Sequence, residues 1–286
     1  GAVVKLATYK DGSRDGQLVV VSRDLSMAHY ASAVASRLQQ ALDDWNFIAP
    51  SLQDLYEVLN QGKARHAFPF DPRMCMAPLP RAYQWADGSA YLNHVELVRA
   101  ARHSEVPESY YTEPLMYQGG SDDFLGPTDD VVCVSESHGI DFEAELAIVI
   151  GRRMRNVTPA AAARYIFGYT AAQDITDRTI QASESQFARS KSFDTFTPVG
   201  PYVETKIDPH DLSIQLFQNG QLRQNGNTSQ LIFNCYEVVS FISTNMTLLP
   251  GDVIVTGTPS GVGPIESGDR LEVRIQGLAP LVNTVK

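Results

Sequence analysis

The sequence predicts a β-rich α+β fold with a small α/β piece at its N-terminus. Short runs of strand character alternate with loops from about residue 140 onward, helical periodicity is strongest before residue 61, and a Pro-rich passage over residues 66–83 separates the two patterns. We therefore expect a small N-terminal α/β domain over residues 1–80 and a larger domain over residues 81–286.

The individual elements follow from periodicity and from turn residues. In the first part, residues 16–22 predict a strand, and residues 32–45 and 51–60 have helical spacing. In the second part, two helices are expected, one beginning at Thr158 and Pro159 and one over about residues 229–244. Two Asn-Gly pairs in QNGQLRQNG, residues 218–226, predict a hairpin. Six runs predict further strands: residues 145–150, 168–174, 196–205, 212–220, 251–257 and 270–275.

Composition limits the partners. The formal net charge of −10 argues against nucleic acid and anionic membrane, and no apolar run is long enough to cross a bilayer. The three cysteines are scattered without metal-type spacing, which favours a reducing, cytoplasmic setting. A small anionic substrate remains compatible with this charge, because it responds to the local field only.

Two glutamates in IDFEAELAIVI raise a specific question. Glu143 and Glu145 stand at i and i+2, so on a strand both carboxylates share one face and repel each other. Either that face is solvated or a cation lies between them. Asp174, at the end of a predicted strand, and Asp87, in WADGSAYLNH, would complete an all-oxygen site for Mg²⁺, Ca²⁺ or Mn²⁺. Each aspartate could equally be an ordinary turn or capping residue.

Other catalytic patterns are missing from the sequence. It contains no H-E-x-x-H zinc pattern, no G-x-x-x-x-G-K-[ST] loop and no G-x-S-x-G elbow. Taken alone, His94 reads as a structural histidine on an apolar helical segment, and Lys191 reads as a surface lysine. Arg178 follows Asp174 by four residues, so one helical turn would place it on the same side, and Gln181 would continue that face.

Four blocks together resemble the fumarylacetoacetate hydrolase superfamily, in the family's order: FEAELAIVIG, AQDITDRTIQ, RSKSFDTFTPVGP and LLPGDVIVTGTPSGVGP. The resemblance implies a mixed β-sandwich roll of that family's type, with residues 81–286 as its catalytic domain. It also implies metal binding by Glu143, Glu145 and Asp174. The substrate or transition-state contacts that it implies are Arg178, Gln181, Lys191 and, toward a carboxylate, Thr258.

The segment before residue 141 resembles the fumarylacetoacetase branch. There a metal-binding Asp precedes the catalytic His by seven residues, as Asp87 precedes His94, and a late strand Glu, here Glu272, orients that His. The branch has Tyr two residues after the Asp; Ser89 occupies this substrate-binding position. The alternative N-Y-x-x-H-x-x-E pattern fits less well, because Glu96 follows His94 by two residues. The second half resembles the acylpyruvase and oxaloacetate decarboxylase branch.

The resemblance implies one divalent cation, Mg²⁺ first, with Mn²⁺ and Ca²⁺ as alternatives, and a small anionic 2-oxo or 2,4-dioxo acid as substrate. The leading interpretation is a hydrolase that cleaves C–C bonds of acylpyruvate, fumarylpyruvate or fumarylacetoacetate-type acids through a metal-stabilised enolate. The alternatives are an oxaloacetate decarboxylase, a hydroxy-dienedioate isomerase, or a non-catalytic relative that keeps the metal. A homodimer is implied in each case.

Overall fold

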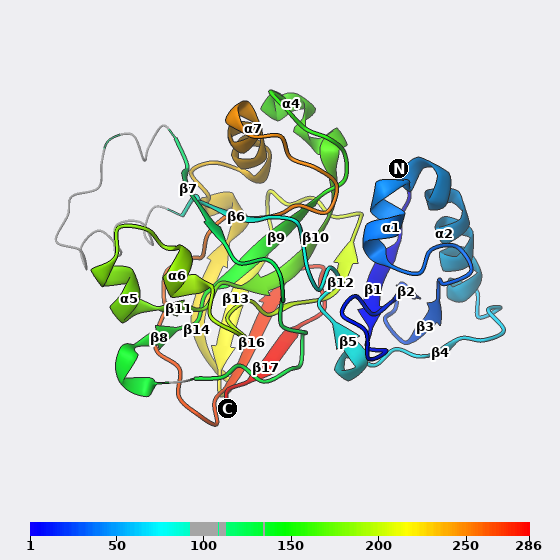
Figure 1. The fold of residues 1–286 in the computed structure, drawn as a ribbon. Coiled ribbons are helices and arrows are strands. Elements are labelled where there is room, and N and C mark those ends of the chain that lie inside the picture. Colours follow the sequence, from blue (N-terminus) through cyan, green and yellow to red (C-terminus); the bar gives the residue numbers. More distant parts are fainter. Residues whose placement is uncertain (92–107, 109–112, 134) are drawn as a thin grey trace.

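One large mixed sheet runs through the molecule (Figure 1). The computed structural model describes residues 1–91, 108, 113–133 and 135–286. The sheet has eleven strands in the order β4-β3-β2-β1-β12-β10-β9-β15-β6-β7, and β5 pairs with β1. In chain order its strands are β1 (Lys5–Tyr9), β2 (Gln17–Val21), β3 (Met27–Tyr30), β4 (Phe68–Pro69), β5 (Cys75–Met76), β6 (Trp85–Ser89), β7 (Leu115–Gly119), β9 (Ala144–Ile150), β10 (Ile166–Gln173), β12 (Val199–Glu204) and β15 (Val253–Val255).

Two smaller sheets and several helices complete the α+β fold. The four-stranded sheet has the order β14 (Gln221–Asn227), β13 (Ser213–Gln218), β16 (Arg270–Ile275) and β17 (Leu281–Thr284), and β8 (Ile140–Asp141) pairs with β11 (Thr176–Asp177). The helices are α1 (Leu38–Asp43), α2 (Trp45–Asn60), α4 (Pro159–Ala162), α5 (Arg178–Ser183), α6 (Ala188–Lys191) and α7 (Cys235–Asn245). Short 3-10 turns are η1 (Pro72–Met74), η3 (Glu136–His138), η4 (Ala163–Tyr165) and η5 (Thr228–Gln230).

The small N-terminal part shares its sheet with the rest of the chain. β1 pairs antiparallel with β12, with Leu6 opposite Val203, so hydrogen bonding continues from one part to the other. One apolar cluster likewise includes Val20 of β2 and Val149 of β9. The division into two domains between residues 80 and 81 stays a prediction. The large sheet is continuous across this boundary.

The predicted helices of the first part differ in detail. The two helical segments expected over residues 32–45 and 51–60 have other bounds: α1 ends at Asp43, and α2 runs from Trp45 through Pro50 to Asn60. The rings of Trp45 and of Phe167 on β10 pack in a T-shaped arrangement, with their centroids 4.6 Å apart. This contact holds the start of α2 on the large sheet.

The hairpin prediction is confirmed for one of the two Asn-Gly pairs. Asn219 and Gly220 join β13 to β14 with φ values of 53° and 80°, as a two-residue hairpin requires. The second pair lies inside β14. The helix expected from residue 229 begins only at Cys235, because the side chain of Asn234 caps it and Glu237 completes a capping box.

β9 is buried on both faces, and this places the two glutamates. Leu146 and Ile148 belong to the apolar cluster that also contains residues of the four-stranded sheet and α7, whereas Ala147 and Val149 belong to the cluster shared with the N-terminal part. Because side chains alternate along a strand, Glu145 shares the face of Ala147 and Val149.

α7 packs against β6 at Gly88, between Asp87 and Ser89. A Cβ atom at Gly88 would lie 2.5 Å from Val238 Cγ1. We predict that Gly88→Ala lowers the free energy of unfolding by about 1–3 kcal/mol, the usual cost of overpacking. Urea denaturation measures this. The loss should shrink when Val238→Ala removes the clash.

Gly120→Ala is the matched control, because its nearest added contact would be 3.4 Å, to Ser192 Cβ. Equal losses in the Gly88 and Gly120 variants would contradict the packing argument.

Candidate metal centre

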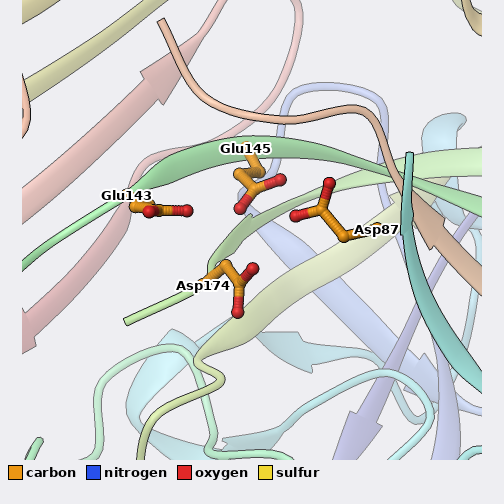
Figure 2. Close-up of side chains that lie close together, drawn as sticks. All are labelled: Asp87, Glu143, Glu145 and Asp174. Carbon is orange, nitrogen blue, oxygen red and sulfur yellow. The ribbon is translucent and has the colours of Figure 1, made fainter. Parts of the chain in front are cut away.

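Four carboxylates from separate parts of the chain meet in the interior (Figure 2). Asp87 lies on β6, Glu145 on β9, Glu143 just before β9, and Asp174 just after β10. One oxygen from each lies within 4.8 Å of the others, and all four side chains are fully buried. β9 and β10 pair antiparallel with Glu145 opposite Ala172, so the end of β10 brings Asp174 to the glutamates.

The backbone after β15 holds the carboxylate of Glu145 in place. The Gly257 N–H donates to Glu145 Oε1 at 3.0 Å. Gly257 has a φ of 100°, and a Cβ there would lie 3.1 Å from the backbone nitrogen of Ala90. Only glycine meets both conditions without strain, so the chain after β15 can approach β6 and the carboxylate together.

Thr258 and Gln224 lock the backbone between the two glutamates. The Thr258 hydroxyl donates to the Ala144 carbonyl at 2.7 Å and accepts from Gln224 Nε2 at 2.8 Å. Gln224 Oε1 accepts the Ala144 N–H at 3.0 Å. Thr258 is therefore part of the scaffold in this structure, and its contact with a substrate carboxylate stays a prediction. Gln224 comes from β14, and no sequence motif indicated it.

Lys191 lies inside the cluster. Its side chain is 2% exposed, and Nζ lies 3.0 Å from Asp174 Oδ2, 3.2 Å from Glu143 Oε1 and 2.8 Å from Thr176 Oγ1. Burial works against the charged form, but Asp174 and Glu143 outweigh it and raise the pKa of Lys191. A buried, charged ammonium replaces the surface lysine that the local sequence suggested.

Arg178 contacts the cluster, but the backbone between Asp174 and Arg178 is not the helical turn that was predicted. No helical turn connects it to Asp174, because β11 intervenes and α5 begins at Arg178, capped by Asp177. Its guanidinium nevertheless donates to Glu143 Oε2 and to Asp141 Oδ2, each at 2.8 Å. Gln181, one turn further, accepts from Arg178 Nη1 at 2.9 Å.

Tyr117 is a site residue that the sequence did not reveal. Its hydroxyl oxygen lies 2.6 Å from Asp87 Oδ2 and 2.8 Å from Asp174 Oδ2. The phenol has one proton, which the two carboxylates share as acceptors. β6 and β7 pair antiparallel with Tyr117 directly opposite Asp87, and only this register brings them together.

The electrostatics and the donor set suit a divalent cation. Burial, and then the neighbouring carboxylates, raise the pKa values of Asp87 and Glu145 well above the ordinary range. Among the described residues, the cations paired with the cluster are Lys191 and Arg178, and two cations are too few to neutralise four carboxylates. Within the described part of the chain, the buried atoms Glu145 Oε2 and Asp174 Oδ1 have no hydrogen-bond partner. Such oxygen ligands are those that Mg²⁺, Mn²⁺ and Ca²⁺ prefer.

The remaining predicted site residues are not all in the cluster. Ser89 is, since its hydroxyl donates to Asp87 Oδ1 at 3.1 Å. Glu272 is not one of the four, and on β16 its carboxylate pairs with Arg270 at 3.1 Å and with Arg274. His94 and Glu96 lie outside the described residues, so the orientation of His94 by Glu272 stays a prediction.

We predict that adding Mn²⁺ raises the melting temperature of the protein, because a ligand of the folded state relieves the repulsion. Glu145→Gln should weaken Mn²⁺ binding at least tenfold in calorimetry. Glu204→Gln removes a buried carboxylate that pairs with Lys5 outside the cluster, and should leave Mn²⁺ affinity unchanged. Equal affinities in both variants would mean that the cluster does not bind the ion.

Mn²⁺ affinity should also rise with pH. Asp87 and Glu145 have raised pKa values, and their protons must leave before both can act as ligands. In the metal-free protein, the free energy of unfolding changes with pH in the opposite direction. The contribution of Asp87 and Glu145 to it is fully present below the ordinary carboxyl pKa of about 4 and is lost as pH rises above that value. Titration calorimetry between pH 5 and pH 8 checks the first trend, and Glu145→Gln should flatten it.

No helix among the described residues is long and apolar enough to span a bilayer.

Comparisons with known proteins show the family of this chain. Two family models match: Fumarylacetoacetase N-terminal domain 2 over residues 4–81, and Fumarylacetoacetate (FAA) hydrolase C-terminal over residues 84–286. The mitochondrial oxaloacetate tautomerase FAHD2B of Bos taurus is 34% identical over 268 residues, covering 85% of this chain and 83% of the relative.

Two solved structures are also similar. The 5-carboxymethyl-2-hydroxymuconate delta-isomerase of Mycobacterium smegmatis is 36% identical with a TM-score of 0.67, covering 77% of this chain and 82% of its own. The maleylpyruvate hydrolase of Sphingobium, solved with manganese(II) and pyruvate, is 26% identical with a TM-score of 0.77 and covers 98% of each chain. The family-model match over residues 84–286 covers more than half of the sequence, and the chain belongs to the fumarylacetoacetate hydrolase family.

Proposed function

We propose that this protein is a divalent-metal-dependent hydrolase that cleaves a C–C bond in a small 2,4-dioxo acid of the acylpyruvate type. The supporting observation is the buried group of four carboxylates with the ammonium of Lys191 beside it. The manganese and pyruvate named for the Sphingobium hydrolase support a metal and an oxo acid in a site of this kind.

A Mg²⁺, Mn²⁺ or Ca²⁺ ion held by Asp87, Glu143, Glu145 and Asp174 would supply Lewis acidity to the oxygens of the substrate. The protein's own residues have two further tasks. Lys191 and Arg178 provide positive charge in a chain of net charge −10, so an anionic acid is attracted locally. The ammonium of Lys191 contacts Glu143, Asp174 and the hydroxyl of Thr176, so a substrate would bind to it by replacing one of these contacts.

For proton transfer we propose His94 as the general base, oriented by Glu272. Gln181, Ser89 and Thr258 are proposed as further substrate contacts. Ser89 and Gln181 are buried beside charged groups, which supports this proposal for them.

A tautomerase or isomerase is the second candidate. The bovine relative is named an oxaloacetate tautomerase and the Mycobacterium smegmatis structure an isomerase, and both are at least 34% identical to this chain. The same acidic centre with proton transfer, but without delivery of water to a carbonyl, would give that outcome. Decarboxylation of oxaloacetate would use the same centre.

A substrate panel separates these reactions. Acetylpyruvate, fumarylpyruvate and oxaloacetate are incubated with and without Mn²⁺ or Mg²⁺, and the products are followed by NMR. Cleavage to pyruvate and a second acid supports the hydrolase, and keto–enol interconversion of oxaloacetate without cleavage supports the tautomerase. His94→Ala should lower turnover about 10²–10⁴-fold, with Glu96→Ala tested beside it. No metal-dependent turnover of any substrate would overturn the proposal.

We also propose a cytoplasmic homodimer that binds neither nucleic acid nor membrane. The net charge supports the absence of nucleic acid and membrane partners, the scattered cysteines support a cytoplasmic setting, and the family resemblance supports a homodimer. Light scattering after gel filtration measures the oligomeric state.

Lys191→Met should lower kcat/KM by about 10²–10³-fold, because removing a charged donor from a buried site removes stabilisation of the developing negative charge. Mn²⁺ affinity should not fall, since the lost ammonium repels a cation. Lys5→Met is the control, because Lys5 pairs with Glu204 away from the four carboxylates. Loss of the metal in the Lys191 variant would show that Lys191 is a scaffold residue instead.

A further inference from the structure

A surface histidine is bonded to a buried carboxylate at the start of α5. His138 Nδ1 lies 2.8 Å from Asp177 Oδ2, and the side chains are 45% and 2% exposed. The other oxygen of Asp177 accepts the Ile180 N–H at 3.0 Å and so caps α5. One carboxylate therefore links an imidazole at the surface to the first turn of the helix that begins with Arg178.

The backbone around His138 also forms hydrogen bonds with the first turn of α5. Thr179 Oγ1 donates to the His138 carbonyl at 2.6 Å, and the Arg178 N–H donates to the Gly139 carbonyl at 3.0 Å. β8 and β11 pair with Asp177 opposite Ile140. The segment from η3 to β8 thus forms a frame on which the start of α5 is fixed.

This turn decides where a planar guanidinium points. Arg178 uses Nε for Asp141, Nη2 for Glu143 and Nη1 for Gln181, at 2.8, 2.8 and 2.9 Å. A guanidinium presents its donors as a rigid fork, so a small rotation of the first helical turn misdirects all of them. A guanidinium that binds a carboxylate through two N–H donors depends strongly on this alignment.

We infer that His138 is a positioning residue for substrate binding: its ring holds Asp177, and through Asp177 it aligns Arg178 and Gln181 toward the carboxylate of the substrate. This inference rests on the proposed function only in taking Arg178 as a substrate contact. The donor required is Nδ1–H, which a neutral imidazole carries in one of its tautomers as well as when protonated. Asparagine places an N–H donor at a similar position, whereas leucine keeps the bulk and removes the donor.

Pyruvate binding to the Mn²⁺-loaded protein, followed by calorimetry, is the test. His138→Leu should weaken pyruvate binding about 3- to 10-fold, the worth of one such hydrogen bond, while Mn²⁺ affinity changes less than about twofold. His138→Asn should restore pyruvate affinity to within about twofold of the wild type. A residue that only stabilised the fold would not give this separation of pyruvate from metal.

His210→Leu is the matched control. His210 Nδ1 also lies 2.8 Å from an aspartate, Asp208, but this pair is on the connection between β12 and β13. It should leave pyruvate affinity unchanged. Equal effects of the His138 and His210 variants would overturn the inference, and so would failure of asparagine to restore binding.

A double-mutant cycle tests the route through Arg178. Arg178→Lys alone should weaken pyruvate binding, and His138→Leu should add little to it, because both changes disable the same contact. Full additivity overturns the inference and leaves the proposed function intact. If Arg178→Lys has no effect, the assignment of Arg178 as a substrate contact fails, and the inference fails with it. No pyruvate binding by the wild type overturns both.

Discussion

The repulsion among four buried carboxylates is the constraint on which the surrounding structure depends. Burying one unpaired carboxylate is costly, and placing four within 4.8 Å of one another is tolerated only with strong compensation. The chain supplies part of it through the ammonium of Lys191, the guanidinium of Arg178, the phenol of Tyr117 and the N–H of Gly257. The charge that remains is of the sign and size that a divalent cation neutralises.

The compensating groups come from distant segments, and the fold is what brings them together. β15 lies between β9 and β6, so the chain that follows it passes both Glu145 and Ser89. Lys191 ends α6, and Arg178 begins α5 after the short strand β11. The frame of η3 and β8 then fixes α5. Asp87 and Glu145 are thus held by strands of the large sheet, whereas Arg178 follows the separate two-stranded sheet of β8 and β11.

Sequence patterns predicted what depends on local spacing. Strand alternation predicted that Glu143 and Glu145 lie together, and their carboxylates do meet, although β9 begins only at Ala144. The Asn219-Gly220 hairpin follows from turn chemistry. Tyr117 and Gln224 could not be found this way, because strand register and contacts between sheets place them. The family resemblance implies Arg178 as a site residue, whereas the helical turn predicted between Asp174 and Arg178 is wrong, since spacing alone could not reveal β11. The family blocks and their order implied the site residues Asp174, Arg178 and Lys191, which periodicity alone could not identify.

The continuous sheet has a consequence for aggregation. β12 lies between β1 and β10, so a chain shortened to residues 81–286 would lose the neighbour of β12 and leave an unpaired edge strand. It would also uncover apolar residues of the shared cluster, among them Val199 and Val203. Unprotected apolar edges recruit strands from other molecules. The small N-terminal part therefore covers the edge of the sheet that carries the acidic centre. Fusions or deletions near residue 80 would lower the solubility of the protein before they affected its catalysis.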